Sequence, residues 1–156
     1  MSSSLKAYSI FLFILSVCLS SCTGSKPSLK EDNASTNAGI NIDTFSEFPP
    51  EIEGCLCSFS NSKNDFESRK YIYVDDYQGN AFISINGDLK KFILSNSQKV
   101  SDEHYITTWT SEGYEVILDY KQVGQEEETW QQKGTMRVKA KGAKELVKEL
   151  YGECGC

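Results

Sequence analysis

This 156-residue chain has few of the residues that mark the common catalytic and nucleic-acid-binding classes. It has one histidine, and its 16 basic residues against 22 acidic ones give a net charge of −6. Because nucleic-acid phosphates are bound by lysine and arginine, this balance argues against a nucleic-acid partner. The chain also lacks a phosphate-binding loop, a dinucleotide fingerprint and a Gly-x-Ser-x-Gly nucleophile motif. We therefore expect a protein that is not an enzyme and uses no cofactor.

The polar clusters that remain have ordinary explanations. His104 follows Asp102 and Glu103, and we expect a solvated loop histidine there, with an acid or pH sensor as the alternative. Asp75-Asp76 begins a predicted turn that ends at Gly79-Asn80, and it lacks the alternating acids of a calcium loop. We expect no metal site at these carboxylates.

Long apolar runs are also missing, apart from residues 10–19. That run of about 10 residues is too short to span a hydrocarbon core, which needs roughly 20. It follows Lys6 and is succeeded by the small residues Ser20-Ser21, which is the arrangement of a secretory signal peptide. We predict that residues 1–21 are this signal.

The sequence Leu19-Ser20-Ser21-Cys22 resembles the lipobox of bacterial lipoproteins. The resemblance implies that Cys22 becomes the first residue of the mature chain and carries diacylglycerol and an N-linked palmitate. Each buried methylene contributes ~0.8 kcal/mol, so several acyl chains hold a protein firmly in a bilayer. Thr23, in place of the aspartate that retains many such proteins at the inner membrane, favours the outer membrane. Lys30-Glu31-Asp32 resembles the short tag that sends some lipoproteins to the cell surface.

Residues 22–48 are predicted to be a lipidated N-terminus and a flexible tether. Most of this segment is small, polar and aperiodic, and such a composition buries too little apolar area to fold. We expect Phe45 and Phe48 to mark the first contact with a single β-rich domain at residues 49–156.

Strand signals dominate that domain. Seven stretches are rich in β-branched and aromatic residues, or alternate apolar with polar residues: 54–60, 71–74, 81–85, 89–94, 105–109, 114–120 and 129–139. Asn86-Gly87 predicts a hairpin turn, and residues 95–101 a polar loop. Gly134 is expected at a bulge or bend. The predicted fold is mainly β, a small antiparallel barrel or sandwich of about seven strands.

The C-terminal segment is ambiguous. Leu146, Val147, Leu150 and Tyr151 have the spacing of a helical stripe, and the neighbouring Lys and Glu residues favour helix. We therefore expect a short helix after Gly142, with a strand as the alternative.

Four cysteines form two Cys-x-Cys pairs, Cys55/Cys57 and Cys154/Cys156, at the two ends of the domain. In extended chain, residues two apart face the same side, about 6.6 Å apart, which disfavours a bond within a pair. We favour two bonds between the pairs. An antiparallel approach gives Cys55–Cys156 and Cys57–Cys154, and a parallel one exchanges the partners. The alternatives are a redox or metal site, because four thiolates suit Zn²⁺ or Cu(I), and free thiols.

Trp109 and Trp130 are candidates for either the core or an exposed recognition surface. The sequence Trp130-Gln131-Gln132-Lys133-Gly134 resembles a stretch of the membrane-bound lysozyme inhibitors, which are outer-membrane lipoproteins with a small β-barrel. This resemblance implies that Trp130 and Lys133 contact a partner, although the inhibitors' Ser-Gly-x-x-Tyr loop is not found here.

The sequence as a whole predicts a membrane-anchored lipoprotein that is a non-enzymatic binding or structural module of the cell envelope. Its expected partners are the lipid bilayer, through Cys22, and a protein or glycan. The alternatives are an inhibitor of a hydrolase such as lysozyme, and a thiol- or metal-binding protein that uses the paired cysteines.

Overall fold

The structure, a computed structural model, describes residues 39–156. The predicted signal peptide, Cys22 and the tether up to residue 38 lie outside the described residues. The described chain has these elements: β1 (Ile42–Asp43), β2 (Leu56–Ser60), α1 (Lys63–Glu67), β3 (Tyr73–Asp75), β4 (Asn80–Ile85), β5 (Asp88–Ser101), β6 (His104–Ser111), β7 (Tyr114–Glu126), β8 (Thr129–Ala140) and β9 (Leu146–Gly155).

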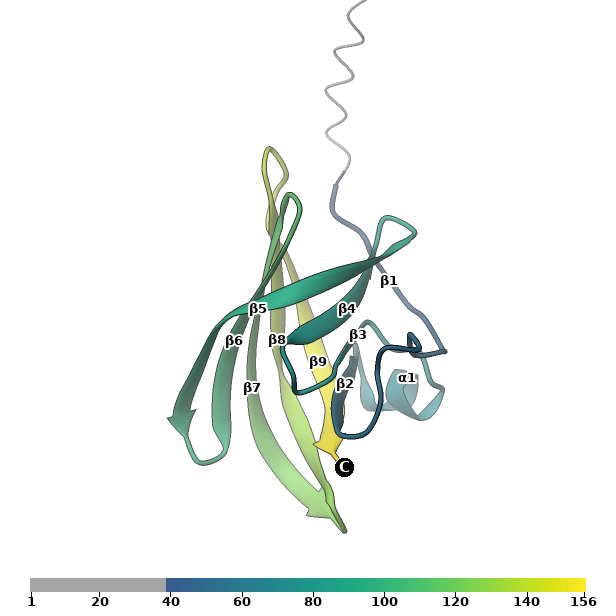
Figure 1. Ribbon diagram of the computed structural model, residues 1–156, viewed down its shortest axis with the longest axis vertical. Coiled ribbons are helices and arrows are strands. Elements are labelled where there is room, and N and C mark those ends of the chain that lie inside the picture. The colour runs from purple at the N-terminus through teal and green to yellow at the C-terminus, as the bar shows by residue number, and fades with distance from the viewer. Residues whose placement is uncertain (1–38) are drawn as a thin grey trace, which may run out of the picture. The chain divides into compact units, whose positions relative to one another are not determined.

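Strands β2 to β9 form a closed antiparallel barrel (Figure 1). Each strand pairs with the next one along the chain, and β9 returns to pair with β2. The short β1 is added to β4 outside this ring, as Ile42 pairs with Ile85. Closure leaves few unpaired strand edges. The prediction of a mainly β fold with a small antiparallel barrel is confirmed.

The predicted C-terminal helix is wrong, because residues 146–155 form β9. This strand pairs with β8 over its length and with β2 over its second half, so it supplies the last wall of the barrel. Leu146, Leu150 and Cys154 share the inner face at a two-residue period, and Lys148 occupies the same face half-buried. Backbone hydrogen bonds to two neighbouring strands outweigh the local helical preference.

Two other boundaries differ from the prediction. The expected polar loop at residues 95–101 is the second half of β5, which pairs with β6 up to Ser101. The packed part of the chain includes residues before 49, because β1 pairs with β4 and Phe45 bridges to Tyr71. The expected aromatic contacts exist, since the rings of Phe45 and Phe48 both lie against Tyr71.

The local turn prediction is confirmed at Asn86-Gly87, where both residues have positive φ, as a type I′ hairpin requires. Gly134 causes no register shift in the β7–β8 ladder; the shift lies between Gln122 and Gly124. A side chain at Gly134 would overlap the Asp119 carbonyl of β7. The glycine is therefore required by close strand approach, not by a bulge.

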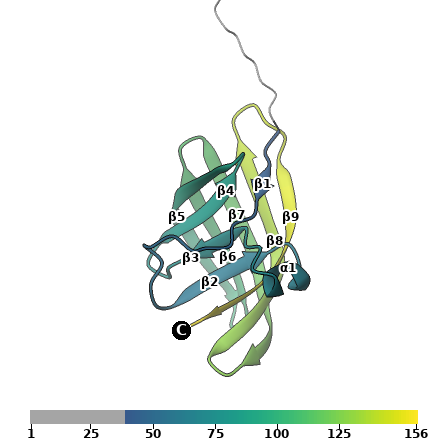
Figure 2. The ribbon, with the colours of Figure 1, turned by 90° about the vertical axis from the view of Figure 1, so that its right-hand side faces the viewer.

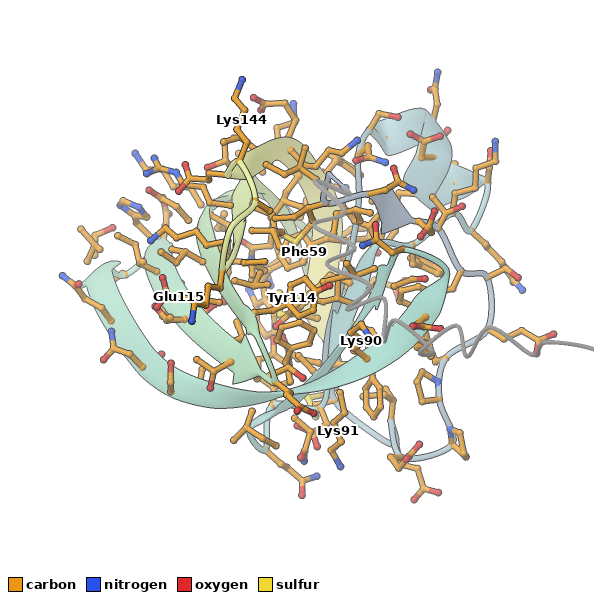
Figure 3. All side chains as sticks on the ribbon, turned by 90° about the horizontal axis from the view of Figure 1, so that it is seen from above. Phe59, Lys90, Lys91, Tyr114, Glu115 and Lys144 are labelled. Atoms are coloured by element: carbon orange, nitrogen blue, oxygen red, sulfur yellow. A yellow bond between two sulfur atoms is a disulfide. The ribbon has the colours of Figure 1, made fainter. Side chains whose placement is uncertain are left out.

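The core fills one end of the barrel. Its largest fully buried side chains include Phe59, Ile83, Phe92, Leu118 and Met136, which come from five different strands. Seen from above, Phe59 lies well inside the ring of strands (Figure 3). The Lys90 ammonium is 5.9 Å from the Tyr114 ring centroid. Interdigitated apolar side chains make this end solid.

A cluster of aromatic side chains lies outside the barrel wall. The helix α1, capped by Ser62 at the Asp65 amide, lies beside β2 and β9 (Figure 2). Its Phe66 ring packs edge-on against Tyr71 and Tyr151.

Within residues 39–156, no helix has the length and apolar character needed to cross a membrane.

Candidate functional site: a cavity at one end of the barrel

The end of the barrel opposite to the packed core contains an open cavity of about 530 Å³. It lies between the β3–β4 turn and the β5–β6 and β7–β8 hairpins. The side chains that point into the barrel explain why this end is not filled. Along β7 they change from Val116 and Leu118 to Tyr120 and Gln122, and on β8 Gly134 separates the buried Met136 from Gln132. Apolar filling therefore stops halfway along the barrel.

Aromatic side chains from several elements contribute to the cavity wall. Five of them line it: Tyr77, Tyr105, Trp109, Tyr120 and Trp130. The Tyr105 and Tyr120 rings are stacked with centroids 6.0 Å apart. Aromatic walls provide large apolar area together with faces of negative electrostatic potential.

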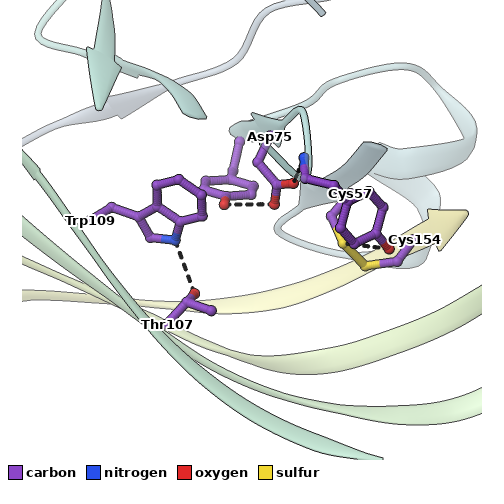
Figure 4. Close-up of a disulfide and its surroundings, with 7 residues drawn as sticks. Cys57, Asp75, Thr107, Trp109 and Cys154 are labelled. Atoms are coloured by element: carbon purple, nitrogen blue, oxygen red, sulfur yellow. Dashed lines mark hydrogen bonds between the residues drawn. A yellow bond between two sulfur atoms is a disulfide. The ribbon is translucent and has the colours of Figure 1, made fainter. Parts of the chain in front are cut away.

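Trp109 forms the inner end of this wall. Its ring lies edge-on to the buried Tyr73, and its Nε1 donates a 2.9 Å hydrogen bond to Thr107 Oγ1 (Figure 4). Because the indole donor is satisfied within the barrel, the ring has a fixed orientation. Trp130 lies nearer the opening and is partly exposed.

Asp75 is a buried carboxylate of the cavity wall. Its oxygens accept hydrogen bonds from the Tyr73 hydroxyl at 2.8 Å and the Tyr77 amide at 3.0 Å (Figure 4). Burial raises the pKa of the Asp75 carboxyl to about 6, although these hydrogen bonds act in the opposite direction. Burial and the Asp75 charge also raise the pKa of Tyr77, to about 12, and that of Tyr120.

The neighbouring Asp76 has a structural role. Its carboxylate accepts hydrogen bonds from the backbone amides of Gln78 and Asn80 and from the Asn80 side chain. The predicted turn chemistry is therefore confirmed for Asp76, and it fixes the loop that carries Asp75 and Tyr77.

Two disulfides join the start of β2, including the residue before it, to the end of β9, including the residue after it. Cys55 is bonded to Cys156 and Cys57 to Cys154, which is the predicted antiparallel pairing. The Cys57–Cys154 bridge lines the cavity, and the Tyr77 hydroxyl lies 3.4 Å from Cys57 Sγ (Figure 4). The bridges therefore hold together the two strands whose pairing closes the barrel.

The structure separates the predicted recognition residues. Trp109 and Trp130 line the same cavity, whereas Lys133 lies on the outer face of β8 and is exposed. Positions three apart on a strand point to opposite faces, so Trp130 and Lys133 do not form one contact surface. His104 Nε2 lies 2.7 Å from Asp119 Oδ1, and neither residue lines the cavity.

Sequence reasoning missed most of the cavity wall. The sequence around Asp75 predicts only a turn, and no motif identifies Tyr77, Tyr105 or Tyr120 as site residues. The alternation of Tyr114, Val116, Leu118 and Tyr120 was a signal for an inward face, but it did not show where the filling ends.

Hydrogen-bonding capacity remains unused in the wall. Gln132 is 5% exposed, and its Oε1 has no hydrogen-bond partner within the described residues. No group of three or more His, Cys, Asp or Glu in residues 39–156 is arranged to hold a metal ion. The arrangement is that of a concave aromatic site with a few polar groups, which is typical of ligand-binding sites.

No protein-family model, curated protein or solved structure gives a significant match to this chain.

Proposed function

We propose that this chain is a lipid-anchored, non-enzymatic binding protein of the bacterial envelope, held at the outer membrane through Cys22. Its ligand, or a protruding group of a protein or glycan partner, occupies the barrel cavity. The observation that carries the proposal is the aromatic cavity of about 530 Å³, which opens at one end of an otherwise packed barrel. A cavity of this size is within the range of small-molecule sites.

The position of the N-terminal entry supports the proposal. The Asn41 amide donates to Asn86 Oδ1, and the Asn86 amide donates to the Asn41 carbonyl, both at 2.9 Å. Asn86 belongs to the β4–β5 hairpin, at the end of the barrel away from the cavity (Figure 1). The described start of the chain near Asn41 therefore lies at the end of the barrel away from the cavity mouth.

A neutral, environment-sensitive dye tests the cavity. We expect Prodan to bind the purified chain with a blue shift of its emission, because the aromatic wall excludes water from it. Ser97 is an exposed lining residue of β5, so Ser97→Trp should narrow the mouth and weaken dye binding at least about tenfold. Gln98→Trp, the next residue of the same exposed strand segment, is the matched control because Gln98 does not line the cavity.

Equal loss of Prodan binding in both variants would mean that the dye binds elsewhere. Absence of a blue shift and of any other small-molecule binding in the wild-type chain would contradict a ligand site in the cavity.

A further inference from the structure

We propose, on the basis of the proposed binding function, that the cavity selects a small organic cation: an ammonium group attached to an apolar or aromatic body. The ammonium would lie against the tyrosine and tryptophan faces, with the Asp75 carboxylate as its counter-charge. The charge of the lining, its aromatic content and its unused acceptor support this ligand class.

All the charged residues that line the cavity are acidic. Asp75 and Asp102 line the cavity, while none of the described lining residues is lysine, arginine or histidine. Lys99 binds Asp102 at 2.8 Å at the exposed rim, so that charge is compensated. Asp75 lies deeper and has no ion-pair partner within the described residues. A buried carboxylate without an opposite charge is costly, and an entering cation relieves that cost.

The groups that face Asp75 reinforce this complementarity. The hydroxyl of Tyr73 and the amide of Tyr77 donate to it, and Asp76 adds a second negative charge nearby. Tyr120, from β7, is close enough to be influenced by the Asp75 charge. Neutral donors satisfy part of the carboxylate but leave its charge uncompensated.

The aromatic residues provide the second recognition element. Tyr77, Tyr105, Trp109, Tyr120 and Trp130 come from one turn and three strands, β6, β7 and β8, and border one space. Cations are attracted to the faces of tryptophan and tyrosine, and the attraction strengthens when water is excluded. An anion would meet the uncompensated Asp75 carboxylate here, and a neutral ligand would gain the apolar contact only.

The unpartnered Gln132 gives a third point of contact. Its amide lies in the cavity wall with hydrogen-bonding capacity that residues 39–156 leave unused. An ammonium is a hydrogen-bond donor and pairs with carboxylate and amide oxygens. The predicted ligand therefore uses charge, aromatic contact and one neutral acceptor together.

Three probes of nearly equal size and different charge test the inference: 2-phenylethylammonium, 2-phenylethanol and phenylacetate. Trp109 and Trp130 are the only two tryptophans of the sequence and both line the cavity, so their fluorescence reports binding directly. At pH 7.5 we expect the ammonium to bind at least about tenfold more tightly than the alcohol, and phenylacetate to bind most weakly.

Asp75→Asn should remove most of the ammonium preference and leave the affinity for 2-phenylethanol within about threefold. Asp88→Asn is the control, because the same chemical change is made on an exposed residue at the other end of the barrel.

If Asp75→Asn fails to fold, acidification of the wild type tests the same point. Ammonium affinity should fall between pH 7.5 and pH 5, as the Asp75 carboxyl with its pKa of about 6 becomes protonated, and alcohol affinity should not.

The outcomes separate this inference from the proposed function. Equal or tighter binding of the alcohol or phenylacetate overturns cation selectivity while the cavity remains a binding site. The same conclusion follows if Prodan binds and no probe does. If neither Prodan nor any probe binds, the proposed function itself is contradicted.

Discussion

At the scale of single residues, Asp75 links the stability of the barrel to its site. An ordinary Asp in an unfolded chain has a pKa of about 3.9. Burial raises the pKa of the Asp75 carboxyl to about 6 in the folded chain, so the folded state binds its proton more tightly than the unfolded state. The contribution of Asp75 to folding therefore becomes less favourable as pH rises from about 4 to about 6.

Asp75→Asn should remove this dependence of stability on pH. The amide does not ionise, so the stability of the variant relative to wild type should increase by about 2 kcal/mol between pH 4.5 and pH 7.5. Urea unfolding of both proteins at the two pH values measures the difference, with Asp88→Asn as the control. An Asp75→Asn effect that is the same at both pH values would contradict a buried, titrating carboxylate.

At the scale of elements, the two disulfides and the β2–β9 pairing form one closing unit. The bonds span 101 and 97 residues of sequence. In the chain-entropy model, closing a loop of about 100 residues stabilises by ~4.7 kcal/mol, but a second bond between the same two strands closes only a small further ring.

Removal of the bonds should therefore be strongly non-additive. We expect the Cys55→Ala/Cys156→Ala pair to cost less than about 2 kcal/mol, because the other bridge still closes the long loop. Removing all four cysteines should cost at least about 4 kcal/mol. Guanidinium unfolding of the three variants, with the Cys57→Ala/Cys154→Ala pair as the third, measures this. Two single-bridge losses that add up to the total would contradict the account.

Elements with local signals were predictable from the sequence, and elements fixed by distant partners were not. Asn86-Gly87 needs only its own backbone conformation to form a turn, and the cysteine spacing needs only the two-residue period of a strand. Residues 95–101 are exposed, and only pairing with β6 makes them a strand. Residues 146–155 form β9 because closure requires a last strand between β8 and β2.

The cavity was less predictable still. It depends on where the inward side chains of several strands change from close-packed apolar residues to Gln122, Gln132 and Ser97. Strand register determines where along the barrel this change occurs. The register is fixed by closure of all the strands into one barrel. The residues around Asp75 predict only a turn. Asp75 belongs to a site only because side chains from distant strands line the same cavity.

At the scale of the whole molecule, the described barrel has two different ends. One end is packed and receives the N-terminal segment through Asn41 and Asn86. The other end is open and carries the aromatic cavity. The predicted lipid anchor at Cys22 is the central claim of the functional account, because the proposed envelope location of this barrel depends on it.

Metabolic labelling of growing cells with an alkyne palmitate tests that claim most directly. We expect the wild-type chain to become labelled and to fractionate with the outer membrane. Cys18→Ser, a substitution within the predicted signal, should retain the label, while Cys22→Ser should lose it. A wild-type product that is as unlabelled as Cys22→Ser would contradict the account.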